Sequence, residues 1–126
     1  MHTVGRLACV LPIVALGACG NPMPPYPTGI HNADPGVRIR SIKMAGDRQD
    51  RATLPLLVER LEDEDEAVRL FAIIAIEKIT GTRLGYEYRK PAVERARAVK
   101  RWRQYLQQET TPAASPVTSS AGPGAS

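Results

Sequence analysis

The sequence predicts an all-α fold in which two similar helical hairpins stack into a short solenoid. The chain resembles itself at an offset of 31 residues between about 34 and 80. Apolar residues recur three and four positions apart through four segments of the region 34–108, which is the spacing of amphipathic helices. The segments directly flanking this region, 19–33 and 109–126, are poor in core-forming residues. We therefore expect one folded domain, at 34–108, between a disordered tether and a disordered tail.

The repeat is supported by six aligned pairs of residues. The offset of 31 matches Asp34 with Asp65, Val37 with Val68, Arg38 with Arg69, Ile39 with Leu70, Ile42 with Ile73 and Ala45 with Ile76. Periods of this length are typical of stacked helical units, which cannot bury their apolar faces alone.

The first helix of the first copy is expected from Asp34 to about Gly46. Asp34 can accept hydrogen bonds from the free amides of the first turn, and Pro35 follows where its missing N–H costs nothing. The expected inward stripe of this helix is Val37, Ile42 and Ala45.

Three further helices are expected at about 54–62, 66–80 and 91–108. Asp65 repeats the capping role of Asp34, and Gly81 is a natural stop after the third helix. The expected inward residues are Leu54, Leu57, Val58 and Leu61; then Val68, Phe71, Ala72, Ala75, Ile76 and Ile79; then Ala92, Ala96, Val99, Trp102 and Leu106. Since two copies are few for a repeat stack, we expect Trp102 to close the core.

The pattern Asp-x-x-Val-Arg at 34–38 and again at 65–69 resembles the HEAT-repeat family, including its short bacterial form. The resemblance covers about residues 34–80. Its signature residues here are Asp34, Val37, Arg38, Asp65, Val68 and Arg69. The stretch from Ile79 to Trp102 is similar to the closing segment of some bacterial proteins that contain HEAT repeats.

Residues 1–18 have the layout of a bacterial signal peptide, with Arg6 before an uncharged apolar run at 7–18. That run is shorter than the roughly 20 residues that span a bilayer, and Pro12 interrupts it. Its end, Leu16-Gly17-Ala18-Cys19, resembles the lipobox of bacterial lipoproteins. The resemblance implies cleavage after Ala18 and a diacylglyceryl group on the Cys19 thiol, with acyl chains of the palmitate type. The alternative is an ordinary cleaved signal peptide with an incidental cysteine.

The segments that flank the expected domain have compositions typical of spacers. Residues 19–33 contain four prolines and read as an extended tether that begins at the lipidated Cys19. Residues 109–126, mostly Thr, Pro, Ala, Ser, Val and Gly, read as a disordered tail.

The sequence contains two charged clusters that are candidate sites. The acidic run 62–66 could bind a hard cation, but it lacks the glycine turn and spacing of a calcium loop, and a solvated turn is the better interpretation. We expect no metal there. Arg38 and Arg69 are expected to pair with neighbouring carboxylates such as Asp65.

Basic residues gather late in the chain and form a candidate surface for a partner or for anionic lipid, with a plainly solvated face as the alternative. They include Arg89, Lys90, Arg97, Lys100 and Arg101. The net charge of +4 is too small to indicate nucleic acid as a partner.

Catalysis is not expected, because the helical region has no histidine or cysteine and Ser41 has no base to activate it. No cofactor and no small-molecule substrate are indicated. We expect a noncatalytic, lipid-anchored interaction or scaffold module of the bacterial cell envelope, facing the periplasm or the exterior, with another envelope protein as its partner. The alternatives are a small lyase-like or chaperone-like accessory enzyme, since some HEAT-like proteins are bilin lyases, and a structural surface lipoprotein that contacts anionic membrane or wall polymer.

Overall fold

The computed structural model describes residues 26–111, and this part of the chain is all-helical, as predicted. The expected signal peptide, the Ala18 cleavage position, Cys19 and most of the expected tail lie outside the described residues. The four α-helices are α1 (Pro35–Asp47), α2 (Leu54–Arg60), α3 (Glu66–Thr80) and α4 (Ala92–Thr110); two short 3-10 helices are η1 (Thr28–His31) and η2 (Arg51–Thr53).

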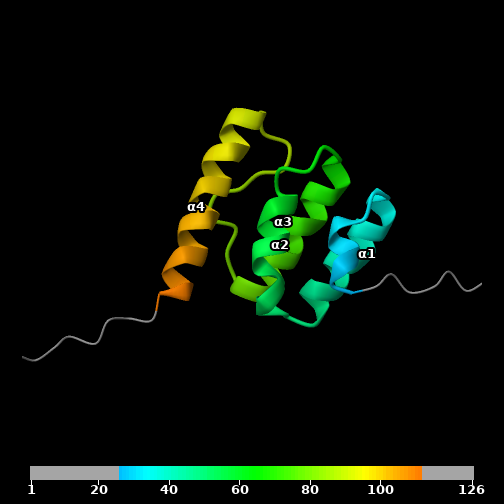
Figure 1. The fold of residues 1–126 in the computed structure, drawn as a ribbon. Coiled ribbons are helices and arrows are strands. Elements are labelled where there is room, and N and C mark those ends of the chain that lie inside the picture. Colours follow the sequence, from blue (N-terminus) through cyan, green and yellow to red (C-terminus); the bar gives the residue numbers. More distant parts are fainter. Residues whose placement is uncertain (1–25, 112–126) are drawn as a thin grey trace, which may run out of the picture.

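Helix α3 lies at the centre of the molecule, with α1 packed along one side and α2 along another (Figure 1). Helix α4 packs against α2, on the side of the molecule opposite α1 (Figure 1). The described chain therefore begins beside α1 and ends on α4, at opposite sides of the fold. None of the described helices is both long and apolar enough to cross a bilayer.

Both predicted helix caps are present. The Asp34 carboxylate accepts a hydrogen bond from the Gly36 amide at 2.7 Å, and the Asp65 carboxylate accepts one from the Val68 amide at 3.0 Å. Gly81 ends α3 with φ of 78°, a left-handed conformation that a residue with a side chain adopts at a cost.

Trp102 closes the core, as predicted, and it has no exposed surface. Its indole Nε1 donates to the carbonyl oxygen of Arg83 at 3.2 Å, so the polar atom of the ring is satisfied. Tyr86, which is 1% exposed, packs in the same core and donates its hydroxyl hydrogen to the Leu61 carbonyl oxygen. Burial raises the pKa of Tyr86 to about 12. These two rings tie α4 and the loop before it to the repeats.

The predicted inward stripe of α4 is partly wrong. Ala92 and Ala96 are exposed, whereas Ala98 and Val99 are buried beside Trp102. The register of a helix is decided by the side chains that bury the most area, and an alanine contributes little of it. Trp102 therefore sets the buried face, and the small alanines of the first turns turn outward.

The fold also starts earlier and ends later than the expected range 34–108. Residues 28–31 form η1, and Ile30 is fully buried instead of lying in an extended tether. A single isoleucine among prolines has no periodic neighbours, so pattern analysis could not place it in the core. Helix α4 runs on to Thr110, two residues past the expected end.

Candidate functional site

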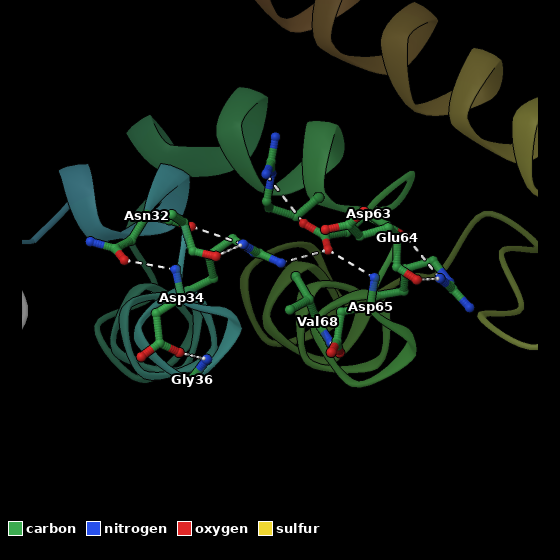
Figure 2. Close-up of polar contacts among 11 residues, drawn as sticks. Asn32, Asp34, Gly36, Asp63, Glu64, Asp65 and Val68 are labelled. Carbon is green, nitrogen blue, oxygen red and sulfur yellow. Dashed lines mark hydrogen bonds and ion pairs between the residues drawn. The ribbon is translucent and has the colours of Figure 1, made fainter.

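A network of hydrogen bonds, here called the polar ladder, joins the two repeats (Figure 2). Its members are Asn32, Ala33, Arg38, Arg60, Asp63, Glu64 and Arg69. Arg38 of α1 makes the contact between the repeats. Its Nη1 donates to the carbonyl oxygens of Asn32 and Ala33, both at 2.9 Å. Its Nη2 donates to the Asp63 carboxylate at 3.0 Å, and the two side chains are only 7% and 3% exposed. The first repeat is thus linked to the turn that begins the second.

Arg69 of α3 repeats half of this arrangement one period later. Its Nη1 donates to the carbonyl oxygens of Asp63 and Glu64 at 2.7 and 2.9 Å. These residues lie 31 positions after Asn32 and Ala33, so the repeat extends to individual hydrogen bonds. The third contact of Arg69 differs, because its Nε donates to the Tyr88 carbonyl oxygen at 3.2 Å.

Asp63 is the centre of the ladder. Besides Arg38, its carboxylate accepts from the Asp65 amide at 3.0 Å and from Arg60 at 3.2 Å. Asn32 makes the equivalent contact to the Asp34 amide at 2.9 Å, with a neutral amide in place of the carboxylate. Among the described residues, the arginine of a preceding repeat reaches Asp63 and not Asn32, and the carboxylate of Asp63 supplies the opposite charge.

Two sequence interpretations of this region are corrected. The carboxylate partner of Arg38 is Asp63, whereas Asp65 is occupied as a helix cap, and Arg69 binds main-chain oxygens instead of a carboxylate. The acidic run 62–66 is not a uniformly solvated turn, because Asp63 is buried within it. The sequence did contain a signal: Asn32 and Asp63 are related by the same offset of 31.

The chemistry of the ladder is structural. Its carboxylate and most of its donors bind one another inside the fold, although the Nε atoms of Arg38 and Arg60 are buried without a hydrogen-bond partner among the described residues. Ser41, on the same helix as Arg38, has no exposed surface for a substrate to reach. Within residues 26–111, no three His, Cys, Asp or Glu side chains gather closely enough to hold a metal ion.

Most cations of the predicted basic surface are engaged within the fold. Arg89 binds Glu66 and lies over the Tyr88 ring, and Lys90 pairs with Glu94 at 3.7 Å. Arg101 donates to the Leu84 carbonyl oxygen at 2.9 Å and so fastens the loop before α4.

Arg97 and Lys100 are the two predicted surface cations without a hydrogen bond or ion pair to any described residue. They share a face of α4 with Val93 and Ala96, at the spacing of three and four that keeps side chains together on a helix. Val93 is 65% exposed. This face, opposite the stripe around Trp102, is what remains of the expected partner or lipid surface.

A second surface feature, which the sequence analysis missed, is a groove between α1 and α3. It encloses a cavity of about 90 Å³. The cavity is lined by Lys43, Gly46, Phe71, Ile74, Ala75 and Lys78. The sequence feature that could have indicated this groove is Gly46. A Cβ at that position would lie 2.9 Å from the Ala75 Cα, so the absence of a side chain lets α1 and α3 approach closely.

Lysines stand on both rims of this groove. The Lys43 ammonium lies 5.8 Å from the centre of the Phe71 ring. The Lys78 ammonium donates to the Asp47 carboxylate at 2.6 Å, and that hydrogen bond lowers the pKa of Asp47 below its ordinary value.

Comparison with protein-family models matches residues 28–98 to the model described as HEAT repeats. The match covers more than half of the chain, and it begins at η1, in agreement with the early start of the fold. Searches of the curated proteins and of the solved structures found no match.

Proposed function

Because the chain belongs to the HEAT-repeat family, we propose that it is a noncatalytic protein-interaction module held at the bacterial cell envelope by a lipid on Cys19. HEAT repeats generally mediate contacts between proteins, which supports a scaffold role. The partner under this proposal is another envelope protein, and the module faces the periplasm or the exterior.

The observation that carries the scaffold role is the Arg38–Asp63 contact between the repeats. A buried, hydrogen-bonded pair fixes the position of one repeat on the next, so the outer helix faces are presented in one geometry. A preorganised surface loses less conformational freedom when it binds, and so retains more of its interaction energy as affinity.

The anchor is supported by the lipobox resemblance at 16–19, and the segment between that position and the fold is short. The described chain begins at Tyr26, seven residues after Cys19. Seven residues reach at most about 25 Å even when fully extended. An anchored chain would therefore keep its α1 side near the lipid headgroups, closer than the tether expected from the sequence.

Crosslinking in cells that make the full chain tests the proposal. Mild crosslinking followed by affinity purification should recover one stoichiometric protein partner. The chain with Cys19→Ser should lose that partner or leave the membrane fraction. Recovery of no protein partner from intact cells would contradict the scaffold role.

A second candidate function is contact with an anionic membrane or wall polymer, which the free face of α4 favours. Arg97 and Lys100 are unpaired among the described residues, and each cation near an anionic surface contributes about 1 kcal/mol. Replacing both with Gln should then weaken salt-sensitive binding of the full chain to anionic vesicles. Equal binding by the double variant would exclude this face as the contact.

A further inference from the structure

We infer that the groove between α1 and α3 docks an acidic segment of a partner protein, which inserts one apolar side chain between Lys43 and Lys78. This inference rests on the proposed interaction function and adds to it the surface used and the chemistry of the partner. Its parts are the shape of the groove, the apolar character of its floor and the sign of the charge around it.

The shape and the floor of the groove suit an apolar side chain. The cavity of about 90 Å³ is lined by Phe71, Ile74 and Ala75 of α3 and by Gly46 of α1. Phe71 and Ile74 are only half-buried although they are large and apolar. A pocket of this kind, with an apolar floor and a polar rim, is where a partner's anchoring side chain gains most on binding.

The charge around the groove points to an acidic occupant. A neighbouring hollow on α1 shares Lys43 and adds Arg40, Met44, Asp47 and Arg48 to its lining. The two hollows together present four cations, and Asp47 is their only carboxylate. Arg40 makes no hydrogen bond or ion pair with the residues that the structure describes. Carboxylates of a partner segment would find unpaired donors here, whereas a basic segment would be repelled.

The same charges disfavour the other occupants. Residues 112–126 of this chain contain no acidic side chain that could pair with Lys43 or Arg40. Helix α4 of a second copy would bring Arg97 and Lys100 toward like charges. A flat lipid surface would contact the lysines but would leave the cavity between them unfilled.

Peptide binding to the full chain in detergent micelles provides the test. The probe is a labelled amphipathic peptide with Glu side chains around one central Leu. Its two controls carry Ser in place of Leu, or Lys in place of every Glu. Fluorescence anisotropy gives the dissociation constants, and NMR shifts identify the residues that are contacted. The Lys43→Glu and Ile74→Gln variants probe the rim and the floor. The matched charge control is Arg103→Glu, an exposed cation of α4 that lies outside the groove and outside the face of Arg97 and Lys100, and circular dichroism is the folding control.

We expect saturable binding of the acidic Leu peptide, with shifts at Phe71, Ile74 and Lys78. Lys43→Glu should weaken it about tenfold, since an attractive pair becomes a repulsive one, and Arg103→Glu should leave it unchanged. Should Ile74→Gln fail to fold, the Lys43→Glu result alone decides. Equal binding of the Lys peptide, equal loss in Arg103→Glu, binding to anionic vesicles only, or no binding would each overturn the inference.

These outcomes are distinguishable from failure of the proposed function. A stoichiometric crosslinked partner that still binds the Lys43→Glu chain in cells would leave the scaffold role standing and the groove excluded. Peptide binding in the groove without any crosslinked partner in cells would contradict the scaffold role, while the groove would still be shown to bind an acidic segment.

Discussion

Arg38 and Asp63 face each other across the junction of the two repeats, 25 residues apart in sequence and 3.0 Å apart between Nη2 and Oδ1. Both side chains are almost entirely buried. Two buried charges depend on each other and on the hydrogen bonds around them, so loss of either partner leaves an uncompensated charge in the interior. Substitution at this contact is therefore expected to be strongly destabilising.

Asp63→Ala is expected to destabilise the protein by about 3–5 kcal/mol, because Arg38 would remain buried without its carboxylate. Equilibrium urea unfolding followed by circular dichroism measures this. Asp63→Asn is the matched variant, since it keeps an oxygen for Arg38 and for the Asp65 amide and loses only the charge, so it should also lose stability. An Asp63→Asn chain as stable as the unchanged chain would show that the charge of the ion pair is not what matters.

Trp102→Ala should cost about 3–5 kcal/mol, the range for removing a large aromatic side chain from a core. The indole is fully buried and bonded to Arg83. Thermal unfolding measures the effect, with Val93→Ala on the exposed face of the same helix expected within about 0.5 kcal/mol of the unchanged chain. Similar melting temperatures for the two variants would contradict the role of Trp102 in closing the core.

Stability should fall at alkaline pH because of Tyr86. The pKa of Tyr86 is raised from 10.0 to about 12, chiefly by burial. Above pH 10 the unfolded chain gives up the phenol proton that the folded chain still holds, so this contribution is complete below pH 10 and is lost between about 10 and 12. Denaturant unfolding across this range should show a smaller decline in Tyr86→Phe than in the unchanged chain. An identical decline would show that another group is responsible.

Gly46→Ala should destabilise the protein by about 1–2 kcal/mol, although alanine is the better helix former. The new Cβ would lie 2.9 Å from the Ala75 Cα and 3.0 Å from its Cβ, so α1 and α3 would have to move apart. The double variant Gly46→Ala, Ala75→Gly should recover part of the loss, because the two positions touch. Additive losses in that double variant would contradict the close contact.

Cys19→Ser should release the chain from the membrane fraction of bacteria that make it. Two or three acyl chains hold a protein on a bilayer, since each buried methylene contributes about 0.8 kcal/mol. Cell fractionation with immunoblotting measures the distribution, and mass spectrometry of the unchanged chain should find acyl groups on Cys19. A Cys19→Ser chain that stays with the membrane would contradict the lipid anchor.

The helices and their caps were predictable because the signals are local. Asp34 and Asp65 begin helices through contacts two or three residues away, and Gly81 ends one through its own backbone conformation. The closing role of Trp102 and most of the core of α3 followed from side-chain size and from apolar periodicity. Phe71 and Ile79, expected inward, are half-buried, and Ile73, which was not in the expected stripe, is fully buried. The lipobox-like segment 16–19 lies outside the described residues, and lipid attachment there stays a prediction.

The contacts that matter most for a binding site were decided by residues far apart in the chain. Pairing of Arg38 with Asp63, burial of Ile30 and the outward turn of Ala92 each depend on what another helix presents, which no short window of sequence contains. The groove beside Gly46 depends on the close approach of the α1 and α3 backbones. Arg97 and Lys100 are unpaired among the described residues because the nearby carboxylates pair with other cations, such as Arg89 and Lys90. The spacing of apolar residues can be recognised within a single helix. Which side chains become buried and which charges pair depends on the contacts between helices.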